Sequence, residues 1–214
     1  MATGIGMKMS ISIISKKFES VTDISTDTLA KWIKYRSMPF EPAGNNTITG
    51  NQSTSGSENV TGSSSEHQVN EVTNATRKLV LLDCRPEEEF VISHLKGSVR
   101  VDFDKDLIEI IKTLPQDLQP VKNLGNTDIV CYCSIGYRSS TVADKFQKYM
   151  KANTASLRPG SEFPAVFNLE GSLFKWANES RHMVDIDGRT TTFAHPYNAM
   201  WGKLLNAELR KWTL

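Results

Sequence analysis

The stretch Asp128-Ile129-Val130-Cys131-Tyr132-Cys133-Ser134-Ile135-Gly136-Tyr137-Arg138 contains the transition on which the fold depends. Its first part, Asp128 to Tyr132, is a mostly apolar run of the kind found in strands that are buried on both faces. After Ser139-Ser140, helical spacing relates the apolar residues Val142, Ala143, Phe146 and Met150. The stretch therefore predicts a strand that ends at Cys133, then a loop, then a helix.

Two further apolar runs predict strands, Leu79 to Leu82, which ends at Asp83, and Ala165 to Leu169. A helical pattern lies between the strands predicted at Leu79 to Leu82 and at Asp128 to Tyr132. It consists of Leu107, Ile108, Ile111 and Leu114, and Pro115 stops it. Strands that alternate with helices predict an α/β fold with a parallel sheet flanked by helices. Functional groups of such sheets gather at the carboxyl ends of the strands, so we expect Asp83 and Cys133 to face one crevice.

The chain divides into three predicted parts. The first is an N-terminal segment over 1–20, which we expect to be disordered. The second is a domain over 21–195, which includes a helix from Asp27 to Arg36 behind the N-cap Ser25 and is interrupted at 44–76 by an insertion rich in Ser, Thr, Asn, Gly and Gln. The third is a C-terminal docking helix over 196–214, based on apolar residues after Pro196. The insertion is predicted to be disordered, and its Asn-x-Ser/Thr patterns are interpreted as chance matches in a biased composition.

Composition limits the classes of function. With 214 residues and a formal charge of +1, the chain is expected to form one domain without a general attraction to nucleic acid or membranes. No apolar run approaches the roughly 20 residues that cross a bilayer. The three cysteines are an odd number in a chain that does not need disulfides, which indicates a reducing compartment. We expect a cytoplasmic protein, with mitochondrial import as the weaker alternative.

The loop after Cys133 carries the predicted chemistry. Its backbone N–H groups, the start of the following helix and Arg138 all favour the Cys133 thiolate over the thiol. Gly136 suits a tight turn or a close backbone approach. Ser134 and Ser139 can supply hydroxyl donors, and the planar fork of Arg138 matches a substrate oxyanion such as the sulfonate end of thiosulfate. Cys133 is therefore the candidate nucleophile.

At these residues the chain resembles the single-domain rhodanese-like sulfurtransferases. Cys133-Ser134-Ile135-Gly136-Tyr137-Arg138-Ser139 is similar to the family's Cys-x-x-Gly-x-Arg-Ser loop. Three further stretches agree with the family in order and spacing: Asp83-Cys84-Arg85 with Glu89-Phe90, His94-Leu95-Lys96-Gly97-Ser98, and Asn168-Leu169-Glu170-Gly171 with Trp176. The resemblance covers about Ile24 to Glu179 once the insertion is set aside.

The resemblance implies a double displacement in which Cys133 accepts a sulfane sulfur, becomes a persulfide and passes the sulfur to an acceptor. It also implies that loop amides of Ser134 through Arg138 cradle the persulfide, and it implies no cofactor. Ile135 and Tyr137 stand where several relatives carry polar or basic residues, so thiosulfate and a persulfide are equally open as donors. A thiol, cyanide or a thioredoxin-like protein can be the acceptor, and the oligomeric state stays open.

Four residues, Asp83, Arg85, Glu89 and His94, are interpreted as supporting the fold through hydrogen bonds, with a proton relay as the alternative. Cys131 is expected to lie deeper in the core than Cys133 and to be inert. A disulfide between Cys133 and Cys84 is favoured slightly over a metal site, for which no Cys-x-x-Cys pair exists.

Two other functions remain open at this point. A rhodanese-like module that only binds a partner is disfavoured by intact Cys133 and Arg138. A phosphatase or arsenate reductase of the same fold is disfavoured by loop length. Related phosphatases have one more residue in this loop, whereas Arg138 is here the fifth residue after Cys133.

Overall fold

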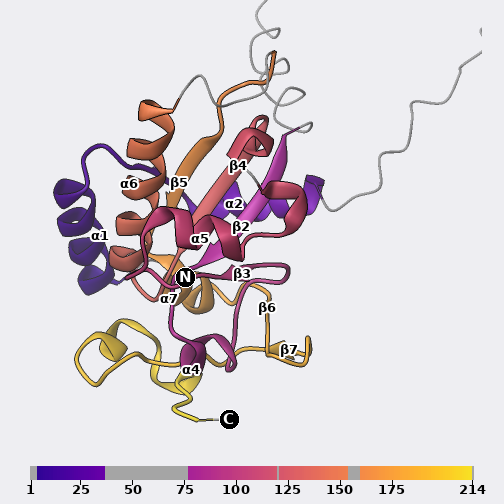
Figure 1. Ribbon diagram of the computed structural model, residues 1–214. Helices are drawn as coiled ribbons and strands as arrows, with labels where there is room; N and C mark the ends of the chain where they lie inside the picture. Colours follow the sequence, from indigo (N-terminus) through magenta and orange to yellow (C-terminus); the bar gives the residue numbers. More distant parts are fainter. Residues whose placement is uncertain (1–3, 37–76, 120, 154–159, 214) are drawn as a thin grey trace, which may run out of the picture.

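The computed structural model describes residues 4–36, 77–119, 121–153 and 160–213 (Figure 1). The insertion predicted over 44–76 lies outside the described residues. The observed architecture is a mixed α/β fold with a parallel sheet flanked by helices, as predicted.

The central sheet has five parallel strands in the order β1-β5-β4-β2-β3. Their bounds are β1 Thr22–Ile24, β2 Lys78–Asp83, β3 Val99–Arg100, β4 Thr127–Tyr132 and β5 Ala165–Leu169. The register places Leu82 beside Cys131 and Asp83 beside Tyr132, so β2 and β4 end together. Strands β2, β4 and β5 agree with the three predicted strands. The short edge strands β1 and β3 were not predicted.

Alternate residues of the two central strands supply the two faces of the sheet. Val80, Leu82, Ile129 and Cys131 belong to one buried cluster, which includes residues of α5 (Leu107–Thr113) and α6 (Tyr137–Ala152). Leu81, Val130 and Tyr132 belong to a second cluster on the opposite face, which includes residues of α1 (Ile5–Lys17), α2 (Thr26–Arg36) and α7 (Ser172–Asn178). The sheet is therefore buried on both faces, which explains its continuous apolar strands.

Two predicted helices begin at side-chain caps. The Asp106 carboxylate accepts the N–H of Glu109 at 3.0 Å where α5 begins, and α5 ends at Thr113, just before the predicted stop at Pro115. The Ser25 hydroxyl accepts the N–H of Thr28 at 3.0 Å where α2 begins, as predicted. Each such cap satisfies one of the N–H groups that a helix start leaves without a partner.

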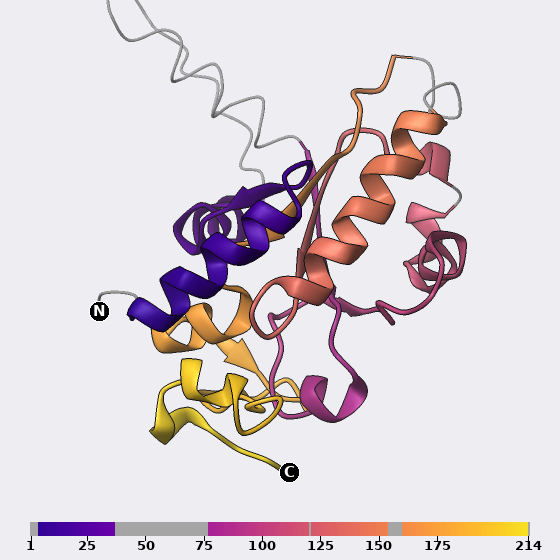
Figure 2. The ribbon, with the colours of Figure 1, turned by 90° about the vertical axis from the view of Figure 1, so that its left-hand side faces the viewer.

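The N-terminal prediction was wrong, because residues 5–17 form helix α1 and not a disordered start. Met7, Ser10 and Ile14 are buried against the second cluster and hold the helix in place. Its other large apolar residues, Ile5, Met9 and Ile13, remain exposed. The helix therefore lacks the single apolar face from which an amphipathic helix is predicted. Figure 2 shows α1 beside α7 and the C-terminal segment.

The C-terminal docking helix predicted over 196–214 is instead a chain with two short 3₁₀ helices, Trp201–Leu204 and Ala207–Leu209. The segment packs on the domain through Leu205, which is buried, and Leu204 contacts α1 at Gly6. Gly202 lies so close to Pro196 that a Cβ atom there would meet the proline ring at 2.8 Å. These tertiary contacts bend the segment before a longer helix can form.

A small antiparallel pair completes the fold. Strands β6 (Met183–Val184) and β7 (Thr190–Thr191) are joined by a turn in which Gly188 has φ +78°. The backbone of Val184 pairs with His94 and ties this hairpin to the segment after α4 (Glu87–Phe90). No helix in the described part of the chain has both the length and the apolar character needed to span a bilayer.

Phe146 tests the packing of α6 on the sheet. Its side chain is fully buried in the first cluster, so Phe146→Ala should lower the free energy of unfolding by about 3–5 kcal/mol, measured by urea denaturation. Lys148→Ala, on the exposed side of the same helix, should cost less than about 1 kcal/mol. Equal losses in the two variants would contradict this packing.

Candidate active site

Cys133 follows the last residue of β4, and the loop after it folds back onto its sulfur. The N–H of Gly136 donates to Cys133 Sγ at 3.1 Å. Gly136 has φ +113° and is the N-cap of α6, which begins at Tyr137. A Cβ atom at this position would have ordinary neighbours at 3.5 Å or more, so the left-handed backbone conformation is what requires glycine.

The environment of Cys133 stabilises the thiolate. Burial by itself would raise the pKa of the Cys133 thiol, since the charged form loses water. The positive charge of Arg138, the hydroxyl and N–H of Ser139 and the N–H of Gly136 outweigh burial and lower this pKa below its ordinary value. Cys133 is therefore ready to act as a nucleophile at a pH where an ordinary cysteine is mostly protonated.

A buried carboxylate holds the arginine of this loop. Arg138 donates to both oxygens of Glu89, at 2.9 and 3.2 Å, and to the Ser134 hydroxyl at 2.8 Å. Ser134 in turn donates to Glu89 at 2.6 Å. Glu89 is only 1% exposed. Of the groups interpreted as supporting the fold, Glu89 is thus the one that reaches the loop directly.

The ring of Tyr197 covers the guanidinium of Arg138, although no chemistry was predicted for this tyrosine. The guanidinium carbon lies 4.7 Å from the centre of the Tyr197 ring, a cation–π distance. Burial would lower the pKa of Arg138, but Cys133 and Glu89 raise it above its ordinary value. Arg138 is therefore a fixed positive charge beside the sulfur, and Glu89 already neutralises much of it.

Asp83, Arg85 and His94, which were also interpreted as supporting the fold, make their contacts within the segment around α4. Asp83 accepts from Arg85 at 2.9 and 2.6 Å, and Arg85 also donates to the Ser93 carbonyl. His94 is stacked on Phe90, and its ring nitrogen contacts the Phe90 carbonyl at 3.1 Å. These contacts join residues within the stretch from Asp83 to His94.

A second loop, after β5, supports the first. The Ser172 hydroxyl accepts the N–H of Cys133 at 3.1 Å, and Leu173 and Phe174 donate to the carbonyls of Cys133 and Ser134 at 3.0 Å. Sequence reasoning did not assign a role to Ser172. Its signal was the neighbouring glycine of the Asn168-Leu169-Glu170-Gly171 motif, which has φ +68° and starts the turn into α7.

Asn168 links the loop to the edge of the sheet. Ser139 donates to the Asn168 side-chain oxygen at 2.6 Å, and the Asn168 amide donates to Asp23, next to it on β1, at 2.7 Å. Ser139, which also helps to lower the pKa of Cys133, is therefore held in place from the opposite side of the loop to Glu89.

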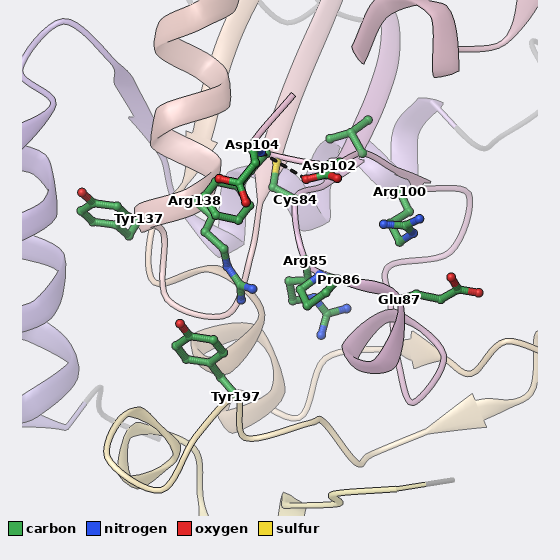
Figure 3. Close-up of a pocket in the computed structure, with 12 residues that line it drawn as sticks. Cys84, Arg85, Pro86, Glu87, Arg100, Asp102, Asp104, Tyr137, Arg138 and Tyr197 are labelled. Carbon is green, nitrogen blue, oxygen red and sulfur yellow. Dashed lines mark hydrogen bonds between the residues drawn. The ribbon is translucent and has the colours of Figure 1, made fainter. Parts of the chain in front are cut away.

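Two cavities meet at the loop. Cys133 lines a cavity of about 380 Å³ together with residues of α1 and the C-terminal segment. The neighbouring cavity, of about 600 Å³, contains Cys84 and Arg85 (Figure 3). Tyr137, Arg138 and Tyr197 line both cavities, so these side chains form the partition between them. The expectation that Asp83 and Cys133 face one crevice was wrong, because Asp83 is fully buried and lines neither of these two cavities.

All three cysteines are free and belong to one buried cluster. Burial raises the pKa of the Cys84 thiol, and its neighbours Cys131 and Cys133 raise it further. Among the described residues, no group of three or more His, Cys, Asp or Glu side chains is arranged to hold a metal ion.

Comparison with known families identifies this loop. The family model described as the rhodanese-like domain matches residues 67–179, which include β2, β4, β5 and both site loops. The chain belongs to the rhodanese-like domain family. The resemblance predicted from the Cys133 loop is thereby confirmed. The rhodanese-like match excludes α1 and everything after residue 179.

The chain is also similar to several solved structures, with low TM-scores and low identities. A rhodanese-related protein from Thermoplasma volcanium is 19% identical, covers 50% of this chain and 83% of its own, and has a TM-score of 0.35. A Pseudomonas aeruginosa thiosulfate sulfurtransferase is 15% identical, with coverages of 58% and 20% and a TM-score of 0.36. A protein of unknown function from Rhodopseudomonas palustris, described as a possible tyrosine phosphatase, is 17% identical, with coverages of 85% and 97% and a TM-score of 0.39. No curated protein matched the chain.

The pH dependence of Cys133 alkylation tests the electrostatics of the site. Because the pKa of Cys133 is lowered, its reaction with iodoacetamide should reach half its maximum rate at a lower pH than that of an unperturbed cysteine thiol. The double variant Glu89→Gln/Arg138→Gln removes the nearby cation without leaving a buried carboxylate unpaired, and should move this midpoint upward. Arg100→Gln, in the neighbouring cavity, should leave it unchanged. An unchanged midpoint in the double variant would argue against Arg138 as a cause.

The buried Asp83–Arg85 pair makes a separate prediction about stability. Arg85→Met leaves the Asp83 carboxylate buried without its partner and should cost about 3–5 kcal/mol of unfolding free energy in urea. The double variant Asp83→Asn/Arg85→Met removes both charges and should recover most of this loss. Arg189→Met breaks an exposed pair with Asp187 and should cost less than about 1 kcal/mol.

Proposed function

We propose that the protein is a sulfurtransferase that carries a sulfane sulfur on Cys133. The observation that carries this proposal is the Gly136 N–H, which lies 3.1 Å from the Cys133 sulfur inside a loop that ends at Arg138. The loop from Cys133 to Arg138 is also one residue shorter than the loop with which related phosphatases hold a phosphate. This favours sulfur chemistry over phosphate transfer.

The reaction takes place in two balanced steps. The Cys133 thiolate attacks the sulfane sulfur of a donor such as thiosulfate, the S–S bond of the donor breaks, and sulfite leaves with the electron pair. The product is a Cys133 persulfide anion. A thiolate or cyanide acceptor then attacks the outer sulfur and releases the Cys133 thiolate. The enzyme's charge does not change over the cycle, and no cofactor is required.

The residues around Cys133 suit both steps. Arg138 and the N–H groups of Gly136 and Ser139 lower the pKa of the thiol, so they also stabilise the thiolate as leaving group in the second step. Glu89 and Ser134 keep Arg138 in position. Ser172, Leu173 and Phe174 satisfy the backbone groups of Cys133 and Ser134, which lets the loop keep its shape while sulfur is added and removed.

Intact mass spectrometry tests the proposal. Incubation with thiosulfate, or with inorganic polysulfide as a second donor, should add the mass of one sulfur atom to the protein, and cyanide should remove it with formation of thiocyanate. Cys133→Ala should not gain this mass, whereas Cys131→Ala, in the same buried cluster, should gain it. Failure of both donors to load the protein, together with hydrolysis of an aryl phosphate, would refute sulfur transfer and support a phosphatase.

A further inference from the structure

The cavity that contains Cys133 is built largely by segments outside the rhodanese-like match at 67–179. Helix α1 contributes Ser10, Ile13, Ile14 and Lys17, and the C-terminal segment contributes Tyr197 and Trp201. Cys133 itself is 1% exposed, so a substrate reaches its sulfur through such a cavity and not from open solvent. The volume of about 380 Å³ falls in the range of small-molecule sites, about 300–1,000 Å³. Its residues outside the family match are therefore placed to select the donor.

The walls of this cavity are mainly apolar. The indole of Trp201 and the side chains of Ile13, Ile14 and Ile135 line it, together with the rings of Tyr137 and Tyr197. Ile13 is 64% exposed, as expected for a residue at the mouth, whereas Ile14 and Ile135 are buried. A ligand without apolar groups would gain little from contact with these walls.

The charges at the cavity are positive. Lys17 and Arg138 line it, and no Asp or Glu does so among the described residues. Arg138 is paired with Glu89, whereas Lys17 donates to the Tyr137 hydroxyl at 2.6 Å and forms no salt bridge within the described ranges. The site thus offers close to one uncompensated positive charge. The neighbouring cavity is different, since acidic and basic side chains both line it: Glu87, Asp102 and Asp104 with Arg85, Arg100 and Arg138.

We propose that Ile13, Lys17 and Trp201 make this cavity selective for a monoanionic organic donor with an apolar substituent, such as a thiosulfonate or an organic persulfide, over thiosulfate. This inference rests on the proposed sulfur transfer at Cys133. Thiosulfate carries two charges and no apolar group, so in this cavity it loses water without gaining apolar contact, and only one uncompensated cation faces it.

The chemistry of the preferred donor balances in the same way as that of thiosulfate. The Cys133 thiolate attacks the terminal sulfur of a thiosulfonate anion, R–SO₂–S⁻. The bond between the two sulfur atoms breaks, and the sulfinate R–SO₂⁻ leaves with the electron pair. Cys133 keeps the terminal sulfur as its persulfide anion. The group R, which Trp201 and Ile13 contact, takes no part in the bond changes.

Single-turnover loading of Cys133, followed by intact mass, separates the effects of R and of charge. Benzenethiosulfonate, methanethiosulfonate and thiosulfate differ in the group beside the sulfane sulfur, so they report on the apolar walls. We expect the second-order loading rate with benzenethiosulfonate to exceed that with thiosulfate by at least about tenfold. Trp201→Ala should remove most of this preference. Ile13→Ala, at an exposed position that tolerates substitution, should reduce the preference in the same direction.

Lys17→Gln should slow loading by benzenethiosulfonate by about fivefold or more at low salt, and added salt should reduce the difference. Lys16→Gln, one residue earlier on α1 and not part of the cavity, is the matched control and should behave like the unaltered protein. Circular dichroism spectra that match the unaltered protein show that each variant is folded.

Two outcomes overturn the inference while leaving sulfur transfer intact: equal loading by the three donors, or normal loading that no cavity variant changes. If neither the three donors nor inorganic polysulfide loads the protein, the proposed function itself is refuted. The two failures are therefore distinguishable in one set of measurements.

Discussion

The carboxylate of Glu89 is the group on which the geometry of the site depends. It is buried, it follows β2 in the chain, and it accepts hydrogen bonds from Ser134 and Arg138 of the loop after β4. A buried carboxylate is stable only with such partners, and the arginine is equally dependent on the carboxylate. The pair therefore fixes the distance between the two loops, and it places a positive charge beside Cys133 without leaving that charge uncompensated.

Hydrogen bonds to other segments of the chain also hold the rest of the loop in place. Three polar groups of the loop bond to other segments: Ser139 to Asn168, the N–H of Cys133 to Ser172, and Ser134 to Glu89. The loop is thus held by strands β2 and β5 on both sides of β4. These bonds help to hold the N–H groups of Gly136 and Ser139 that lower the pKa of Cys133, and this preorganisation stabilises the thiolate.

The central strands and the nucleophile were predictable because their signals are local. An apolar run followed at once by a cysteine, a glycine and an arginine carries both the strand and the loop within a dozen residues. Glu89 belongs to one of the stretches that resemble the family. Its contact with Arg138, however, depends on the pairing of β2 with β4, which no local sequence pattern predicts. The structures of residues 5–17 and of the C-terminal segment were predicted wrongly for a related reason. Met7 and Leu205 are buried only because distant parts of the chain supply a surface for them.

Tyr197 covers the guanidinium of Arg138 from a segment far along the chain. The strands that form the sheet, and Cys133 with them, are synthesised well before this residue. The cation–π cover of Arg138 therefore depends on the packing of a segment that follows all five strands of the central sheet in the chain.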